Sequence, residues 1–279
     1  MNQTFSFGRF SLLVKNHWAE NKKKYLLSIP AFMGLLLLWF LFILLTKEWD
    51  PMAEGLQQVT YFFSLFALGV IYASQFFGDL GSRPKAINYL MVPASTLEKF
   101  LCSLLYSTAI FFAVFTIGFY IVDALMVGIA NATNTSYNEV VSGKTPMKAT
   151  ITNVFYSKEF GGNKGWMSFY FFLMFLTVQS AYLLGSVYFP KYSFIKTTIS
   201  QLILMLVFFL LIYFLNESVM PNGGYHNGLT SYRIERPNDA SLLVRLPQWL
   251  EKVLKYLLMY ALPPLLWLVT YQRLKEKQV

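Results

Sequence analysis

Long apolar runs alternate with short polar segments along this 279-residue chain. Each run is close to the roughly 20 residues that a helix, rising about 1.5 Å per residue, needs to cross a hydrocarbon layer about 30 Å thick. The runs are continuously apolar and lack the alternation typical of transmembrane β-strands. The pattern therefore predicts one all-α integral membrane domain with six spanning helices, at about residues 25–46, 59–78, 97–122, 166–189, 197–215 and 254–271.

The segment before the first run has a different pattern. Within residues 5–24, apolar side chains recur at helical spacing, while most charged ones lie off that stripe or at its end. The apolar set is Phe7, Phe10, Val14 and Trp18. This pattern favours an interfacial helix on the inner membrane surface, and an ordinary cytoplasmic helix is the alternative interpretation.

Composition and charge agree with a membrane protein. The chain is 56% hydrophobic and 13% charged, against roughly 25% charged in an average soluble domain. The net charge of +9 is distributed over the segments between the apolar runs rather than along one soluble face. It therefore favours contact with membrane lipid and argues against nucleic acid as a partner.

Basic residues predict the orientation. Lysine and arginine are frequent in residues 1–24, in the loop 80–96 with Lys99 just beyond it, and in the C-terminal tail. The segment 47–58 carries one lysine and three carboxylates. The positive-inside rule then favours a multi-pass protein with both termini in the cytoplasm and with outside loops at 47–58, 123–165 and 216–253.

Groups that carry catalysis or bind metals are scarce. His17 and His226 are the only histidines and belong to different predicted segments, and Cys102 is the only cysteine. Asp79 and Asp123 fall at the ends of predicted spans, which argues against a proton relay in the membrane interior. The sequence therefore predicts no catalytic, metal or cofactor residue, and the chain is not expected to be an enzyme.

Small and amide residues within the spans predict helix packing. Gly69 with Ala73, and Ala181 with Gly185, place small residues four positions apart, which permits close approach of helices. Gln179 either lines a path through the membrane or hydrogen-bonds between helices, and the second interpretation is favoured.

The polar stretch between the second and third runs contains a helix start. Ser95 followed by Glu98 forms an S-x-x-E capping box, which fixes the beginning of the third span. Pro93 separates this helix from whatever precedes it. The preceding residues 82–91, "SRPKAINYLM", have Ile87, Leu90 and Met91 at helical spacing, and they fit a short amphipathic helix as well as a plain interfacial loop.

The run "INYLMVPASTLEKFL" (residues 87–101) resembles the segment after the second span in type-2 permease subunits of bacterial ATP-binding-cassette (ABC) exporters, which have an "LPAS..EKF" pattern. The tail "YQRLKEKQV" is similar to the ending of the same proteins. The order of an N-terminal interfacial helix, six spans and no nucleotide-binding domain is also similar.

The resemblance implies a coupling helix that docks on a separate cytoplasmic ATPase, with ATP and Mg²⁺ bound by that partner and none by this chain. It also implies a second permease subunit, in a homodimer or a heterodimer, and a location in the bacterial inner membrane. The implied docking residues are Arg83, Lys85, Ile87, Asn88, Tyr89, Leu90, Met91 and Pro93, and Ser95 and Glu98 cap the helix to which they connect.

Two other functions remain possible from the sequence. A non-transporting membrane scaffold or assembly factor would act through its outside loops. A membrane enzyme acting on lipid would need clustered His, Asp, Glu or Cys side chains near one surface, and the sequence has no such cluster.

Overall fold

The computed structural model describes residues 5–46, 54–141, 148–155, 166–219, 231–235, 241–245 and 247–277. The remaining parts of the predicted outside loops, and with them His226, lie outside the described residues. Helices dominate, and a short antiparallel hairpin was not expected from the sequence. The elements are α1 (Phe7–Thr46), α2 (Glu54–Gln75), α3 (Arg83–Met91), α4 (Thr96–Leu104), α5 (Phe111–Val141), α6 (Trp166–Tyr188), α7 (Ser193–Val219), β1 (Ser231–Glu235), β2 (Ser241–Arg245), α8 (Gln248–Tyr256) and α9 (Leu262–Glu276).

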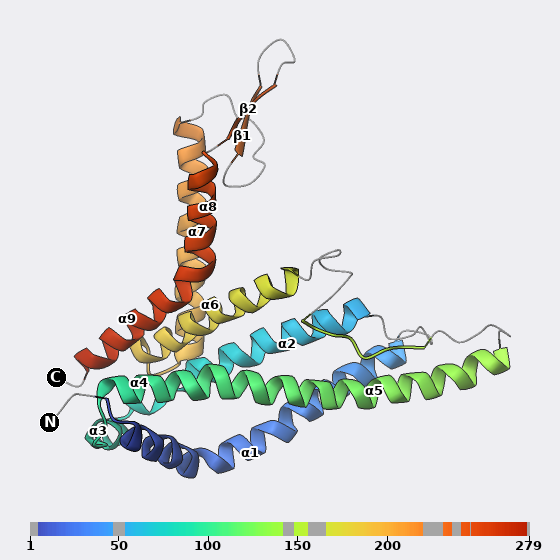
Figure 1. Cartoon of the computed structure of the whole chain (residues 1–279), viewed down its shortest axis with the longest axis horizontal. Coiled ribbons are helices and arrows are strands. Elements are labelled where there is room, and N and C mark those ends of the chain that lie inside the picture. Colours follow the sequence, from blue (N-terminus) through green and yellow to red (C-terminus); the bar gives the residue numbers. More distant parts are fainter. Residues whose placement is uncertain are drawn as a thin grey trace.

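Helices α1, α2, α4–α5 and α6 lie side by side as an elongated bundle (Figure 1). The two ends of the chain and α3 lie at the same end of this bundle, which we call the terminal end (Figure 1). Helix α9 packs against α4 and α6 there. The terminal end therefore joins segments from the beginning, the middle and the end of the sequence.

Among the residues that the structure describes, five helices are long and apolar enough to cross a membrane: Phe7–Thr46, Glu54–Gln75, Thr96–Thr133, Ser168–Tyr188 and Ser193–Phe214. They correspond to the first five predicted spans, and they support a multi-pass membrane protein. The sixth predicted span, residues 254–271, is not among them. Its residues are divided between α8, a π-helical turn (Leu257–Ala261) and α9, and the chain changes direction there (Figure 1). One residue, Leu262, separates the π turn from Pro263 and Pro264, and both π turns and prolines are known causes of helix bends.

Two other boundaries differ from the sequence-based expectation. The predicted interfacial helix and first span form one helix, α1, which bends as it passes from the terminal end into the bundle (Figure 1). Helix α5 continues to Val141, well into the predicted outside loop. Residues 148–155 then pack against the far end of the bundle, where Ala149 and Val154 are buried.

Aromatic rings from several helices fill the bundle core. Tyr61 of α2 meets Phe119 of α5 edge to face, with ring centroids 5.0 Å apart, and its hydroxyl lies 2.9 Å from the Thr116 hydroxyl. Such pairs contribute about 0.5–1.5 kcal/mol beyond the area they bury. A Cβ atom on Gly69 would lie 2.6 Å from the Phe175 ring of α6. The absence of a side chain at Gly69 therefore lets α2 and α6 approach closely, as the small-residue spacing predicts.

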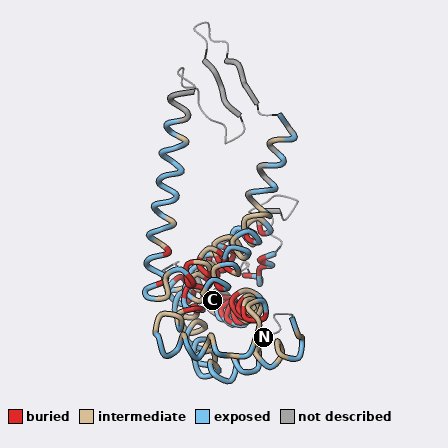
Figure 2. Tube along the Cα trace, turned by 90° about the vertical axis from the view of Figure 1, so that its left-hand side faces the viewer, coloured by how far each residue is buried: buried red, intermediate tan, exposed pale blue. Residues whose placement is uncertain are grey.

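Helices α7 and α8 project from the bundle as two separate arms (Figures 1 and 2). Within the most apolar 18-residue stretch of α7, only 6% of the residues are buried. A helix that is apolar all round and unburied needs a hydrocarbon environment or a protein partner. The α7 arm is thus suited to lipid along most of its surface.

Candidate docking segment at the terminal end

Helix α3 is the centre of the candidate site. A 3₁₀ turn (Gly78–Gly81) connects it to α2, and Pro84 occupies its first turn, where the missing N–H of proline costs nothing. Val92 and Pro93 end it, because proline cannot continue a helix at that point. The sequence left a helix and a plain loop open for residues 82–91, and the structure has a helix.

The predicted capping box at the start of α4 is confirmed. The Glu98 backbone N–H donates to Ser95 Oγ at 3.2 Å, and the Ser95 N–H donates to Glu98 Oε2 at 2.8 Å. The Glu98 side chain is fully buried. Its second oxygen, Oε1, accepts from the Ser6 N–H at 2.8 Å and from Arg9 Nη2 at 3.0 Å. Glu98 therefore joins the start of α4 to the start of α1.

Lys99 makes the complementary connection to α3. Its ammonium donates to the Leu90 carbonyl at 3.0 Å and lies 5.5 Å from the centre of the Tyr89 ring. Lysine near a helix C-terminus satisfies carbonyls that have no partner within the helix and offsets their partial negative charge. Lys99 is itself 2% exposed. Adjacent residues of opposite charge thus fasten α1 and α3 to the same turn of α4.

The predicted docking residues divide between two faces of α3. Tyr89 points inward, where its ring meets Phe77 edge to face at 6.2 Å, and Leu90 is partly buried. Burial raises the pKa of the Tyr89 hydroxyl. The exposed members are Arg83, Lys85, Ile87, Asn88, Met91 and Pro93. Ile87 and Met91 are 55% and 76% exposed, so the outward apolar contact lies at these two residues rather than at Tyr89 and Leu90.

Two further contacts hold the connection before α3. Lys85 pairs with Asp79 at 3.2 Å on the exposed surface, where such pairs contribute at most about 1 kcal/mol. A Cβ atom on Gly81 would lie 2.8 Å from the Pro190 carbonyl oxygen, so glycine lets this turn pack against the connection between α6 and α7. The turn that leads into α3 therefore contacts both α3 itself and the α6–α7 connection.

Asp123 and Gln179, two polar groups that the sequence singled out, lie elsewhere in the described residues. No group of three or more His, Cys, Asp and Glu side chains that could hold a metal ion is found among the residues that the structure describes. Asp123, expected at a span end, is buried within α5, and neither carboxylate oxygen has a hydrogen-bond partner in the described part of the chain. Gln179 donates to the Ser107 carbonyl in the π-helical stretch Leu105–Ile110, as expected for an interhelical hydrogen bond.

Sequence reasoning found Ser95 and Glu98 but missed Arg9 and the role of Lys99. Arg9 is separated from Glu98 by 89 residues, and no local pattern joins the two. Comparison with protein-family models, curated proteins and solved structures gives no match. The class that the structure defines is accordingly a multi-pass, predominantly helical membrane protein. At one end, its short surface helix α3 is held by contacts with α4 and with the connection that follows α2.

Proposed function

We propose that this chain is the permease subunit of an ABC exporter and that α3 is the coupling helix to a separate cytoplasmic ATPase. The observation that carries this proposal is the pair of contacts made by Glu98 and Lys99, which tie α3 and α1 to the start of a candidate span. A surface helix that transmits a movement to the membrane spans needs such contacts. Without them, the helix would move without moving the spans. The resemblance of "INYLMVPASTLEKFL" to the permease segment supports the same assignment.

In this proposal, ATP and Mg²⁺ bind to the partner, and this chain hydrolyses nothing. Closure of the ATPase dimer would push α3, and the push would reach α4 through Lys99 and α1 through Glu98. Rigid-body movement of packed helices is a common way to carry a local change across a membrane domain. A second permease subunit, identical or different, would complete the path, and the membrane would be the bacterial inner membrane with both termini in the cytoplasm.

The test is co-purification with an ATPase that contains a complete phosphate-binding loop, identified by mass spectrometry and assayed for ATP hydrolysis. The double variant Ile87→Asp with Met91→Asp places two carboxylates on the exposed apolar contact of α3. We expect it to abolish the association while leaving membrane insertion intact. Tyr192→Asp is the matched control, because Tyr192 is 78% exposed on the neighbouring α6–α7 connection.

The proposal fails if the ATPase remains bound to the α3 double variant, or if no ATPase accompanies the wild-type chain. The alternative proposal is a scaffold or assembly factor that acts through its outside loops. The described part of one such loop is held to the bundle, since Gln57 bonds Thr150 and Thr152 and Asn131 bonds Ala149. Deletion of outside-loop residues would then impair function more than the α3 substitutions.

A further inference from the structure

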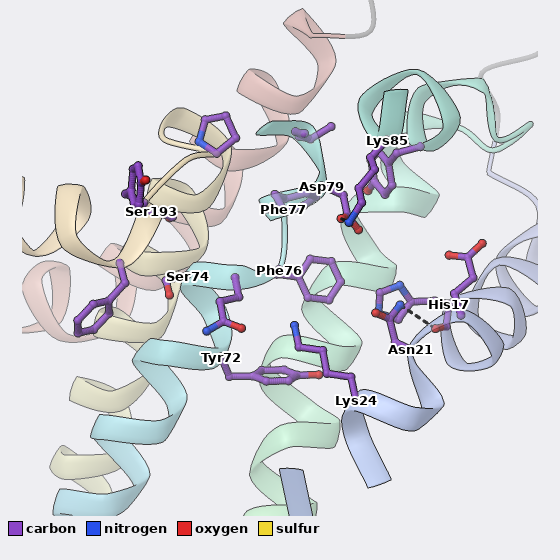
Figure 3. A pocket seen from close by; sticks show the side chains of 18 of the residues that line it. His17, Asn21, Lys24, Tyr72, Ser74, Phe76, Phe77, Asp79, Lys85 and Ser193 are labelled. Atoms are coloured by element: carbon purple, nitrogen blue, oxygen red, sulfur yellow. Dashed lines mark hydrogen bonds and ion pairs between the residues drawn. The ribbon is translucent and has the colours of Figure 1, made fainter. Parts of the chain in front are cut away.

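A large polar cavity lies beside α3 at the terminal end. Its volume is about 740 Å³, and α1, α2, the start of α3 and the start of α7 form its walls (Figure 3). Charged side chains of both signs line it, namely Glu20, Lys24, Asp79 and Lys85. The charged side chains in this lining offer partners to a charged headgroup.

A second cavity, of about 240 Å³, lies between α1, α2 and the α4–α5 helix. Its lining is mainly aliphatic and aromatic, and it includes Ile29, Phe32, Ile71 and Val114. Ile71 is 42% exposed, so the cavity borders the outer surface of the bundle. Such a groove on a membrane-spanning surface fits an acyl chain.

The two cavities adjoin each other. Four residues line both of them: Lys24, Tyr25, Tyr72 and Gln75. The aromatic rings at this boundary are packed into the bundle, where Tyr25 stacks on Tyr106 at 5.8 Å and Tyr72 stacks on Phe111 at 5.3 Å. The polar cavity thus continues into the apolar cavity, and packed aromatic rings form the boundary between them. This arrangement matches an amphiphile, which has a polar headgroup and an apolar chain.

Lys24 supplies the charge at the boundary. Its side chain extends from α1 toward α2 within the polar cavity (Figure 3). Lys85 is paired with Asp79, and Glu20 accepts from the Asn16 amide at 2.8 Å. Lys24 forms no ion pair with any residue in the part of the chain that the structure describes, so its ammonium is available to an anionic group at the level where the apolar groove begins.

We propose that these cavities together form a binding site for an anionic membrane phospholipid, with the phosphate at Lys24 and one acyl chain in the groove between α1, α2 and α4–α5. Moving an acyl chain from the bilayer into the groove exchanges one apolar environment for another. Binding therefore depends on the contact between the phosphate and Lys24, with the groove setting the position of the lipid. This inference goes beyond the proposed coupling to an ATPase and does not depend on it.

The experiment uses the full chain in phosphatidylcholine nanodiscs that contain a phosphatidylglycerol probe with a photoreactive acyl chain. After illumination, the labelled peptides are identified by mass spectrometry. We expect labelling of groove peptides, and Lys24→Gln should lower it by about fivefold, the factor expected for one lysine contact at a membrane surface. Lys23→Gln is the matched control, because Lys23 is exposed on the same basic run and lines neither cavity.

The groove has its own variant. Ile71→Trp fills the apolar cavity and should reduce labelling of the groove peptides, whereas Leu38→Trp changes an exposed position of α1 that lines neither cavity. Thermal unfolding in detergent verifies that each variant is folded. Equal labelling of Lys24→Gln and wild type would overturn the phosphate contact, and equal labelling of Ile71→Trp would overturn the groove.

Competitors identify the source of the phosphate. Unlabelled phosphatidylglycerol should displace the probe, while diacylglycerol, which lacks phosphate, and glycerophosphoglycerol, which lacks acyl chains, should not. Displacement by glycerophosphoglycerol alone would mean that the site takes a soluble phosphodiester and would overturn the lipid assignment. Because the nanodiscs contain no ATPase, the result is separate from the test of α3 docking.

Discussion

Glu98 and Lys99 are neighbours in sequence with opposite charges. Both are buried, and each hydrogen-bonds to a different helix. The Glu98 carboxylate accepts two backbone N–H groups and the Arg9 guanidinium, while the Lys99 ammonium donates to the end of α3. A buried charge that is paired and hydrogen-bonded is tolerated, but one left without partners is strongly destabilising. These residues therefore determine how the terminal end is assembled.

Removing the Glu98 carboxylate should be costly. Glu98→Ala leaves the Ser6 and Ser95 N–H groups without their acceptor and breaks the Arg9 contact, so we expect a loss of about 3 kcal/mol in the free energy of unfolding. Denaturant unfolding in detergent micelles measures it. Asp79→Ala, which breaks the exposed pair with Lys85, is the control and should cost less than about 1 kcal/mol. Similar losses for the two variants would contradict this account.

At the scale of elements, close approach depends on a few small side chains. The spacing of Ala181 and Gly185 predicts that one helix comes close to α6, and α7 is that helix. A Cβ atom on Gly185 would lie 2.0 Å from the Thr197 hydroxyl oxygen. The sequence identified which residues permit the contact, but which helix fills the space depends on the tertiary arrangement and was not readable.

The close approach can be tested by adding one methyl group. Gly185→Ala should destabilise the protein by about 2 kcal/mol, because the packed α6–α7 contact has no room for it. Gly128→Ala serves as a matched control within a helix, since in the described part of the chain no atom outside the neighbouring residues and the backbone of its own helix lies within 4 Å of a Cβ there. Alanine favours helix over glycine, so Gly128→Ala should cause no loss. Thermal unfolding of both variants gives the comparison, and equal behaviour would rule out the steric explanation.

At the scale of the molecule, long apolar runs were sufficient to predict a helical membrane protein, and the first five predicted spans correspond to long apolar helices in the described residues. The sixth predicted span is not confirmed, because the π turn with Pro263 and Pro264 divides its residues between α8 and α9 and bends the chain, which hydropathy does not predict. The local start of α4 was predictable from Ser95 and Glu98. The inward position of Tyr89 was not predictable from the sequence, because it depends on how Phe77 and Lys99 pack against α3.

The number of crossings decides where the C-terminus lies. Both ends of the chain lie at the terminal end (Figure 1), so we expect the α7–α9 region to return the chain to the side of the membrane on which it starts. Single-cysteine variants at Met91, Ile151 and Lys275, made on a Cys102→Ser background, can be labelled with a membrane-impermeant maleimide in oriented vesicles. Met91→Cys and Lys275→Cys should react from one side, and Ile151→Cys from the other.

Labelling of Lys275→Cys from the same side as Ile151→Cys would mean an odd number of crossings. The termini would then lie on opposite sides of the membrane, and the expectation drawn from their position at one end of the bundle in Figure 1 would be wrong. All three positions are exposed in the structure, so failure to react cannot be attributed to burial within this chain.

The contacts at the start of α4 also determine which helices would move together at the terminal end. Because α1 and α3 are both hydrogen-bonded to one turn of α4, a displacement of α3 would be passed on to α1. Helices α1 and α4–α5 are also two walls of the apolar cavity that continues from the polar cavity. If α3 moves, rotation about the Glu98–Lys99 turn would therefore change the width of the apolar cavity, which borders the outer surface of the bundle.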